Sequence, residues 1–483
     1  MHDAFILNRD LVTSYEPSGK VLVDLIRRDF SQKGTTVACR EGDCGACTVL
    51  VGELKGKDVF YRSKTSCISP WQHAAGKHIV TIEGLCQFEE NSNQTFKLNP
   101  LQDLFREQSA TQCGFCTPGF MVSLAGFLLR SEDLTLENAI ASVDGNICRC
   151  TGYKSIERAI SILVSKYKEH LDNEKDRLKA LVNIGLIPSY FERIPSRLKD
   201  LAESMPTSRP LASPKKKSII MGGGTDLLVQ QADDIYQKKL FNTQETLNES
   251  ISLKNGNLLV GAACRIEDFR TSPLVQSVIA DIKELLKMFA STQIRHQGTI
   301  AGNIVNASPI GDLSNFLLAM GTHVHLDSPE GKREVPLEDF FISYKKTAKK
   351  DHEWVSYFSF ETPGKNSYIN LEKVSKRTYL DIASVTTSMH LKMEGNLISS
   401  AKFSAGGVAP IPMLLQKMSA FLSGKRLDPS IIKEGVHIAL EEISPISDVR
   451  GSREYKRLLL RQLLFAHFLK KFPSKVSLVE LTS

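Results

Sequence analysis

Three short stretches decide how the N-terminal part of this 483-residue chain folds: CREGDCGAC at residues 39–47, QCGFCTPGF at 112–120 and GNICRCTGY at 145–153. With one further cysteine they contain eight of the ten cysteines in the chain. The eight form two sets of four, which are Cys39, Cys44, Cys47 and Cys67, and Cys113, Cys116, Cys148 and Cys150. Because four thiolates hold one 2Fe-2S cluster, the sequence predicts two such clusters.

The first set has the C-x4-C-x2-C spacing with a distant fourth cysteine, which is the plant-type arrangement around a 2Fe-2S cluster. Gly42 and Gly45 lie between the ligands, where a tight loop needs unusual dihedrals and backbone N–H groups that point at sulfur. A zinc site would favour paired C-x2-C knuckles. Disulfides would need an oxidising compartment. The spacing therefore favours the iron-sulfur cluster over both alternatives.

The second set, C-x2-C followed by C-x-C, fits either zinc or iron when taken alone. Pro118 is suited to the first turn of a helix, and a second helix is expected to begin near Tyr153. The apolar residues expected on one face of each helix are Phe120, Met121, Leu124, Ala125 and Leu128, then Ile156, Ala159, Ile160, Leu163 and Val164. These stripes predict the core of a helical bundle, and the two helix N-termini would help to stabilise the thiolates.

QCGFCTPGF and GNICRCTGY, downstream of CREGDCGACTV, closely resemble the iron-sulfur portion of the molybdenum hydroxylases, the group of xanthine dehydrogenases and aldehyde oxidases. The resemblance implies a ferredoxin-like β-grasp domain at residues 1–85 and a helical bundle domain at 86–168. Each would carry one 2Fe-2S cluster. The charged stretch that follows, 169–190, is expected to be a linker.

Composition agrees with a multidomain globular protein, because 42% hydrophobic and 24% charged residues over this length suit three or four domains. The sequence shows neither a signal peptide nor a membrane span, so we expect a cytoplasmic protein. In that compartment cysteines are more often metal ligands than disulfides, and the remaining Cys86 and Cys264 are expected to be buried thiols. The net charge of +7 is scattered, which predicts no nucleic-acid partner.

A glycine-rich stretch, SIIMGGGTDLLV at residues 218–229, follows the linker. A short strand leads into three glycines and then into an apolar helical pattern, a geometry in which backbone N–H groups can hold phosphate. It is not the G-x-G-x-x-G fingerprint, because Leu227 occupies the last position. Taken alone, the loop is equally well explained as a tight turn with Asp226 as a helix cap.

A second stretch, QIRHQGTIAGNIVNASPIGDL at 293–313, is rich in small residues that a flat ring or a diphosphate can approach closely. Both stretches resemble the FAD-binding domain of the molybdenum hydroxylases, as do Lys373 and the GGVAP turn at 406–410. Phe289 matches an aromatic that packs on the adenine in relatives, although its apolar spacing alone suggests core. The FAD-binding residues implied by the resemblance are Met221, Gly222, Gly223, Gly224, Thr225, Asp226, Leu227, Phe289, Thr299, Ile300, Ala301, Gly302, Asn303, Ser308, Asp312 and Lys373.

The fold class expected from the resemblance is therefore multidomain α+β, with an FAD-binding domain at 191–365 and a C-terminal α+β domain of the flavin module at 366–483. The chain departs from the family in two places. Ala301 stands where relatives often have glycine. Tyr379 and Leu380 precede Asp381 where relatives often carry an acidic residue, in a stretch that lies near the nicotinamide site.

Iron-sulfur clusters pass one electron at a time, whereas a flavin can hold two. A chain that carries both therefore converts single-electron transfer into a two-electron reduction. The resemblance is strongest to the small, iron-sulfur and FAD subunit of the xanthine dehydrogenases. It implies that hypoxanthine or xanthine is hydroxylated on a separate large molybdopterin-binding subunit, and that electrons pass through both clusters and FAD to NAD+. The resemblance also implies a dimer of small–large pairs, an assembly common in the family. It further implies that no residue of this chain catalyses the hydroxylation. The alternatives are a subunit of an aldehyde or N-heterocycle dehydrogenase, and a zinc-bearing scaffold.

Overall fold

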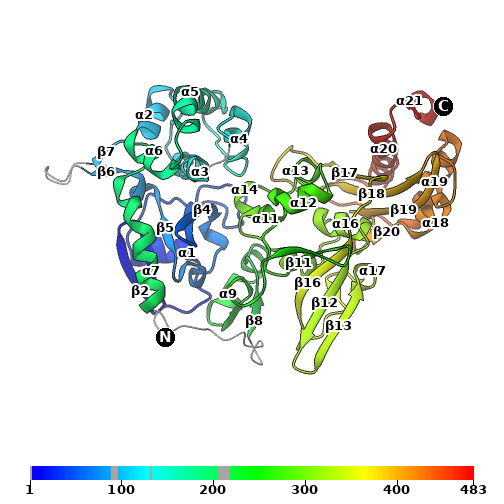
Figure 1. Cartoon of the computed structure of the whole chain (residues 1–483), viewed down its shortest axis with the longest axis horizontal. Helices are drawn as coiled ribbons and strands as arrows, with labels where there is room; N and C mark the ends of the chain where they lie inside the picture. The colour runs from blue at the N-terminus through cyan, green and yellow to red at the C-terminus, as the bar shows by residue number, and fades with distance from the viewer. Residues whose placement is uncertain (1–2, 89–95, 131–132, 205–217, 483) are drawn as a thin grey trace. The chain divides into compact units, whose positions relative to one another are not determined.

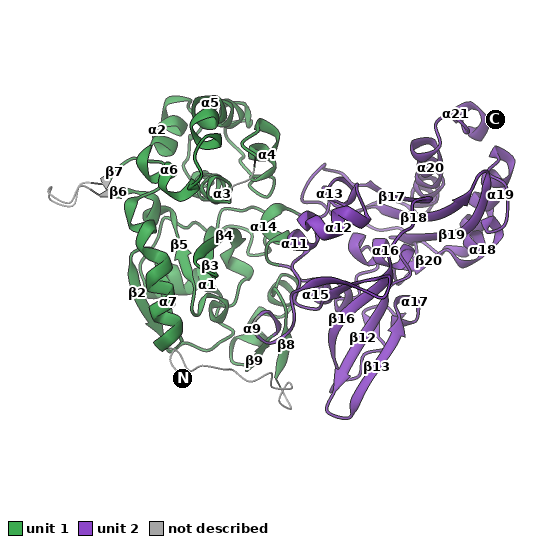
Figure 2. Ribbon diagram, in the orientation of Figure 1, with its two compact units in different colours: residues 1–242, 291–297 green, residues 243–290, 298–483 purple. Residues whose placement is uncertain are grey.

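The computed structural model describes residues 3–88, 96–130, 133–204 and 218–482. The chain divides into two compact units (Figures 1 and 2). Unit 1 comprises Met1–Asn242 and Ser291–Gln297, and unit 2 comprises Thr243–Ala290 and Gly298–Ser483. The short segment Ser291–Gln297 therefore belongs to unit 1 although its sequence neighbours belong to unit 2.

The N-terminal part of unit 1 is a five-stranded sheet in the order β2-β1-β5-β3-β4. Its elements are β1 Asp3–Leu7, β2 Asp10–Ser14, α1 Leu22–Asp24, β3 Thr48–Lys55, β4 Asp58–Thr65 and β5 His78–Val80, with a π-helical turn at Leu25–Asp29. Strands β1 and β5 are parallel and the other pairs are antiparallel. Phe5, Ile26, Val49 and Ile79 are fully buried between the sheet and the helical turn. This arrangement confirms the predicted β-grasp fold.

The helical part of unit 1 contains α2 Pro100–Glu107, α3 Thr117–Leu129, α4 Leu136–Ala141, α5 Lys154–Asp172, α6 Arg177–Asn183 and α7 Ile194–Ser204, with the short strands β6 Gln87–Phe88 and β7 Phe96–Lys97. The predicted starts of α3 and α5 are confirmed, and every residue of both predicted apolar stripes is buried. Helix α3 also packs against β3 and β4, which explains why it is buried on nearly every side. The stretch 169–190, expected to be a linker, buries Leu171 and Leu181 in the bundle core.

The remainder of unit 1 consists of the glycine-rich stretch and the elements that come directly after it. Strand β8 (Ile219–Met221) pairs in parallel with β9 (Leu240–Asn242), and α8 (Leu227–Gln230) and α9 (Ala232–Tyr236) connect them. Met221, Leu228 and Ile235 are buried in one cluster with Cys47 and Cys67. The predicted strand before the glycines is confirmed, and its end packs against the first cysteine loop.

Unit 2 contains two sheets. The first has the order β10-β11-β16-β12-β13, and the second has the order β17-β18-β19-β20. Their strands are β10 Ile251–Lys254, β11 Asn257–Gly261, β12 His323–Ser328, β13 Gly331–Pro336, β16 Trp354–Glu361, β17 Ser367–Val374, β18 Val385–Glu394, β19 Leu397–Gly406 and β20 Met413–Leu414. A separate hairpin joins β14 (Phe341–Ser343) and β15 (Lys346–Thr347).

The longer helices of unit 2 are α16 Asp312–Ala319, α18 Gln416–Leu422, α19 Pro429–Glu442 and α20 Arg453–Lys471. The shorter ones are α10 Thr243–Thr246, α11 Ile266–Thr271, α12 Pro273–Val278, α13 Ile282–Leu285, α15 Ile300–Val305, α17 Leu337–Phe340 and α21 Leu478–Thr482. Helix α16 packs against β18 and β19, and α20 packs against β17 and β18. In the described part of the chain, no helix is both long enough and apolar enough to cross a bilayer.

Candidate cluster and flavin sites

The first cysteine loop, residues 39–47, is bent by backbone conformations that favour glycine. Gly42 and Gly45 have φ angles of +80° and +65°, and Arg40 also has a positive φ of +57°. These bends turn amides toward sulfur, since the N–H of Glu41 donates to Cys39 Sγ over 3.4 Å. Backbone hydrogen bonds also reach the Cys44 and Cys67 thiols. Amides directed at these sulfurs fit a cluster held by thiolates.

The four thiols of the first set interact with one another. A hydrogen bond with Cys44 is the main cause that lowers the pKa of Cys39, and the same bond raises the pKa of Cys44. Cys67 is hydrogen-bonded to both Cys39 and Cys47, and these bonds raise its pKa. The sulfurs therefore converge, and two of the four residues, Cys47 and Cys67, are almost fully buried.

The second set lies at the start of two helices. Cys113 and Cys150 are exposed and their sulfurs are 3.4 Å apart, whereas Cys148 is buried and Cys116 half-buried. Burial, followed by the hydrogen bond with Cys148, raises the pKa of Cys116 to about 12. The N–H of Thr151 donates to Cys148 Sγ over 3.4 Å.

Helix α3 begins directly after Cys116, and α5 begins after Tyr153, close in sequence to Cys150. Their N-termini place partial positive charge near the thiolates, as expected. Within the described residues, no group of three or more His, Cys, Asp or Glu is arranged around a single metal ion. The convergent sulfurs and inward amides are the observations that fit iron-sulfur clusters.

The two cysteine loops are in direct backbone contact inside unit 1. The N–H of Ile147, next to Cys148, donates to the carbonyl oxygen of Cys44 over 3.0 Å. The amide of Asn146 donates to the carbonyl oxygen of Gly45 over 2.9 Å. Two hydrogen bonds therefore join the loop of the first cysteine set to the loop that carries Cys148 and Cys150.

The segment Ser291–Gln297, which contains α14 (Thr292–Arg295), holds these loops from one side. The amide of Gln293 donates to Ser123 Oγ and Asn146 Oδ1 over 3.0 and 2.9 Å. The amide of Gln297 donates to the carbonyl oxygens of Ile68 and Gly223 over 2.7 and 2.9 Å. These roles were not predicted, because the positions of Gln293 and Gln297 in the sequence do not show which partners they meet.

The glycine-rich turn is part of unit 1. Met221 is fully buried, Gly223 and Gly224 are buried, and Gly222, Thr225, Asp226 and Leu227 are half-buried. Gly224 has a φ of +80°, and a Cβ atom there would lie 3.2 Å from the carbonyl oxygen of Ile68. Asp226 occupies the N-cap position of α8, but its side chain makes no cap hydrogen bond. The turn therefore packs against the residue that follows Cys67.

The other residues implied by the resemblance lie in unit 2. The Thr299 hydroxyl caps α15 and accepts from the N–H of Gly302 over 3.0 Å. Gly302 is exposed, while Ala301 packs its methyl group against the core of unit 2 together with Phe289. Ile300 is buried, and Ser308 Oγ accepts from the N–H of Ile310 over 3.4 Å. The extra methyl of Ala301 is thus accommodated by packing.

Asp312 and Lys373 form a buried ion pair with a Nζ–Oδ2 distance of 2.7 Å. The Lys373 ammonium also donates to the carbonyl oxygens of Met288 and Asp381, so its three N–H donors are all used. Burial raises the pKa of Asp312, and Lys373 opposes that shift. One side-chain oxygen each of Asn303 and Asp312 is buried without a hydrogen-bond partner among the described residues. Such orphaned acceptors fit a ligand that donates hydroxyl groups.

Three family models match the chain. The "[2Fe-2S] binding domain" covers residues 81–161, the "FAD binding domain in molybdopterin dehydrogenase" covers 193–360, and the "CO dehydrogenase flavoprotein C-terminal domain" covers 372–471. These matches support the molybdenum hydroxylase family. The multidomain α+β architecture of these enzymes, with 2Fe-2S, FAD-binding and C-terminal flavoprotein domains, is thereby confirmed for this chain.

Curated relatives among the molybdenum hydroxylases are distant in sequence but align along nearly the whole chain. Xanthine dehydrogenase of Emericella nidulans is 28% identical over 90% of this chain and 36% of its own length. Xanthine dehydrogenase of Oryza sativa is 26% identical over 94% and 38%, and aldehyde oxidase 4 of Rattus norvegicus is 24% identical over 96% and 39%. The chain thus spans about two fifths of the length of these relatives.

Solved structures share the fold over about half of the chain. Carbon monoxide dehydrogenase from Hydrogenophaga pseudoflava matches with a TM-score of 0.51 and 22% identity, over 55% of this chain and 93% of that chain. Quinoline 2-oxidoreductase from Pseudomonas putida 86 matches with a TM-score of 0.50 and 24% identity, over 54% and 91%. At this level of identity the similarity concerns the fold alone.

Proposed function

We propose that this chain is the electron-transfer subunit of a molybdenum hydroxylase, with one 2Fe-2S cluster on each set of four cysteines and one FAD. The observation that carries the proposal is the hydrogen bond from the Ile147 N–H to the Cys44 carbonyl oxygen, which joins two convergent thiol sets. When bound, the clusters supply one-electron steps and FAD supplies the two-electron step.

The chain's own residues would hold these groups in place. The N–H groups that point at sulfur stabilise thiolates, and the loop contact through Ile147 and Asn146 fixes the two ligand sets relative to each other. In unit 2, the orphaned oxygens of Asn303 and Asp312 are the acceptors we assign to hydroxyl groups of FAD. Lys373 would act by orienting Asp312, because its donors are already used.

We further propose that the substrate is hypoxanthine or xanthine, hydroxylated on a large molybdopterin-binding partner subunit in a dimer of small–large pairs. The curated xanthine dehydrogenases that align along 90% or more of this chain support this assignment. The glycine turn of residues 221–227 remains a predicted part of the FAD site.

The proposed acceptor is NAD+, and this part rests on the family resemblance alone. The Asp381 carboxylate accepts from the N–H groups of Arg377 and Ile382 over 2.8 and 3.0 Å, so the loop uses it internally. Leu380 is buried with a φ of +52°. Another two-electron acceptor is the alternative.

An aldehyde or N-heterocycle dehydrogenase is the second candidate for the whole enzyme. It is favoured by the alignment with aldehyde oxidases at 24% identity over 96% of the chain. Both candidates share the electron-transfer role and differ only in the substrate of the partner.

An anaerobic visible spectrum of the complex purified from its own host, before and after xanthine, tests the proposal. Bleaching of both the flavin and the iron-sulfur bands is expected. If xanthine has no effect and dithionite bleaches both bands, the redox role stands and the substrate is wrong. If neither reductant changes the spectrum, the redox role is wrong.

A further inference from the structure

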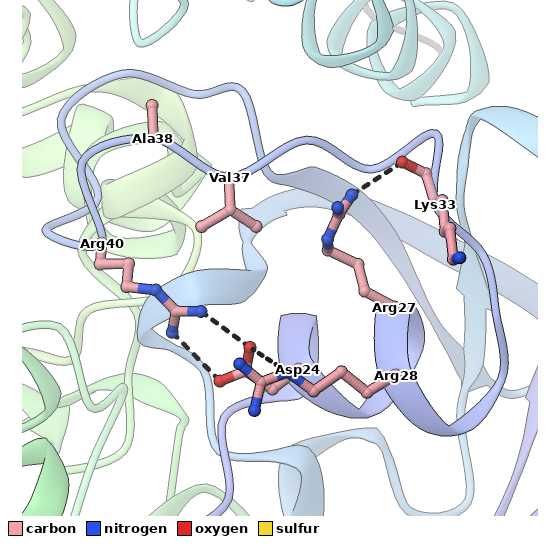
Figure 3. Close-up of a pocket in the computed structure, with 7 residues that line it drawn as sticks. All are labelled: Asp24, Arg27, Arg28, Lys33, Val37, Ala38 and Arg40. Carbon is pink, nitrogen blue, oxygen red and sulfur yellow. Dashed lines mark hydrogen bonds and ion pairs between the residues drawn. The ribbon is translucent and has the colours of Figure 1, made fainter.

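A cationic pocket lies beside the first cysteine loop in unit 1. It has a volume of about 400 Å³ and opens between the π-helical turn Leu25–Asp29 and the loop that leads to Cys39 (Figure 3). The residues that line it are Asp24, Arg27, Arg28, Lys33, Val37, Ala38 and Arg40. None of the functions proposed above uses this pocket.

The lining carries four cations and one carboxylate, which is an excess of three positive charges. Asp24 is already satisfied, because the Arg40 guanidinium donates to both of its oxygens over 2.8 and 3.1 Å. Arg28 lies farther from it, with a closest distance of 3.8 Å. Among the lining side chains, the single carboxylate therefore leaves most of the positive charge without a counter-charge.

The pocket is shaped by the hydrogen bonds of Arg27 and by the position of Val37. Arg27 donates to the carbonyl oxygens of Lys33 and Thr35 over 2.7 and 2.6 Å, which fixes the loop against the helical turn. Val37 lies between the side chains of Arg40 and Arg27 in Figure 3. The Lys33 side chain is exposed. A volume of this size is at the lower end of small-molecule pockets, and guanidinium groups suit phosphate oxygens.

One wall of the pocket is formed by the start of the first cysteine loop and the two residues before it. Val37, Ala38 and Arg40 line the pocket, and the predicted iron ligand Cys39 lies between Ala38 and Arg40 in the sequence. Reduction adds one negative charge to a 2Fe-2S cluster, so an anion in the pocket would repel the added electron.

We propose that this pocket binds a compact phosphate-bearing anion of diphosphate size, and that its binding is coupled to the redox state of the first cluster. The oxidised protein binds the anion more tightly than the reduced protein. By reciprocity, the bound anion lowers the reduction potential of that cluster by the same free energy. The coupling rests on the proposed function, whereas the binding itself does not.

Isothermal titration calorimetry of the oxidised holoprotein with inorganic pyrophosphate tests the binding. We expect one site per chain, and at least a tenfold weaker affinity in the double variant Arg28→Gln/Lys33→Gln, whose side chains are both exposed. Lys57→Gln is the matched control, because Lys57 is an exposed cation of the β3–β4 turn on the same sheet and does not line the pocket. No binding, or an equal loss per removed charge in the control, would overturn the pocket as a specific site.

Repeating the titration on electrochemically reduced protein tests the coupling. We expect roughly tenfold weaker binding, which corresponds to a potential about 59 mV lower for the first cluster at saturating pyrophosphate. Electron paramagnetic resonance during a redox titration measures that shift. Equal affinities in both states with an unchanged potential would refute the coupling. Absence of iron would refute the proposed function instead, and the affinity of the protein as purified for pyrophosphate would still decide the pocket.

Discussion

Gly45 is enclosed by the second cysteine loop, and this enclosure decides which residue the position tolerates. It has a φ of +65°, and a Cβ atom there would lie 2.3 Å from the Gly145 carbonyl oxygen and 2.5 Å from Asn146 Nδ2. Gly56 has nearly the same φ, +64°, but a Cβ atom there would meet nothing within 4 Å. The two glycines therefore have the same left-handed backbone conformation, but only Gly56 has room for a Cβ atom.

We expect Gly45→Ala to displace the contact between the two loops and to lower the iron content per chain. Gly56→Ala should cost only about 1 kcal/mol, the price of a left-handed alanine, and should keep full iron. Iron analysis and thermal unfolding of both variants measure the difference. Equal behaviour of the pair would show that the close contact between the loops is not required.

His467 predicts a pH dependence of stability in unit 2. It is fully buried; Nδ1 accepts from the Asn370 amide over 2.8 Å, and Nε2 lies 2.9 Å from the Thr387 hydroxyl. Burial lowers its pKa from 6.5 to about 3. Below pH 6.5 His467 binds a proton in the unfolded chain, but in the folded chain it stays neutral down to about pH 3. The free energy of unfolding therefore falls as the pH falls through that window.

Between pH 7 and pH 5 this effect amounts to about 2 kcal/mol, at about 1.4 kcal/mol per pKa unit. His467→Gln stays neutral and can keep both hydrogen bonds, so it should lose about that much less stability over the same range. Urea unfolding of both proteins at the two pH values gives the comparison. The same pH slope in both would contradict a neutral buried His467.

At the scale of the elements, the segment Ser291–Gln297 anchors to the helical bundle through a buried ion pair. Arg295 and Asp144 are 2% and 4% exposed and 3.2 Å apart, and the N–H of Thr292 donates to the same carboxylate over 2.7 Å. Arg295→Met would leave Asp144 buried without its cation. We expect a loss of about 3–5 kcal/mol in the free energy of unfolding of unit 1.

The exposed pair Lys154–Glu157 provides the comparison, because its side chains are 81% and 45% exposed. Lys154→Met should cost less than about 1 kcal/mol. Adding Asp144→Asn to Arg295→Met should recover part of the loss. If Arg295→Met were as mild as Lys154→Met, the buried pair would not anchor the segment.

The sequence predicted elements well where local chemistry determines them. Pro118 and the apolar stripes located α3 and α5, and the run before the glycines located β8. It did not predict that residues 291–297 belong to the iron-sulfur unit, because that depends on partners distant in the chain such as Asp144 and Ser123. Cys86, expected to be buried, is half-buried and accepts from the Gln102 amide instead, while Cys264 is buried as predicted.

For the whole molecule, the candidate sites also contain some features that the sequence predicted and others that it did not. Cysteine spacing predicted both sets of four thiols, and the structure brings the members of each set together. Residue identity alone did not show that Lys373 has no spare donor or that Ala301 packs inward. Those facts depend on how strands and helices meet, which motif spacing does not encode.

The proposed route predicts a specific defect at whole-molecule scale. Cys113→Ser removes an exposed thiol of the second set, which belongs to unit 1. We expect the variant to keep FAD and the first cluster but to lose electron transfer from the partner subunit. Flavin content and substrate-driven bleaching of the complex measure the two properties, and retained turnover would break the proposed route.

The central claim is that this chain holds two 2Fe-2S clusters and one FAD. Iron, acid-labile sulfide and flavin analysis of the purified chain, with electron paramagnetic resonance of the reduced protein, measures it most directly. The account predicts iron and sulfide in the proportion of two clusters to one flavin, and two distinct cluster signals. Bound zinc without visible absorption would contradict it and favour a structural scaffold.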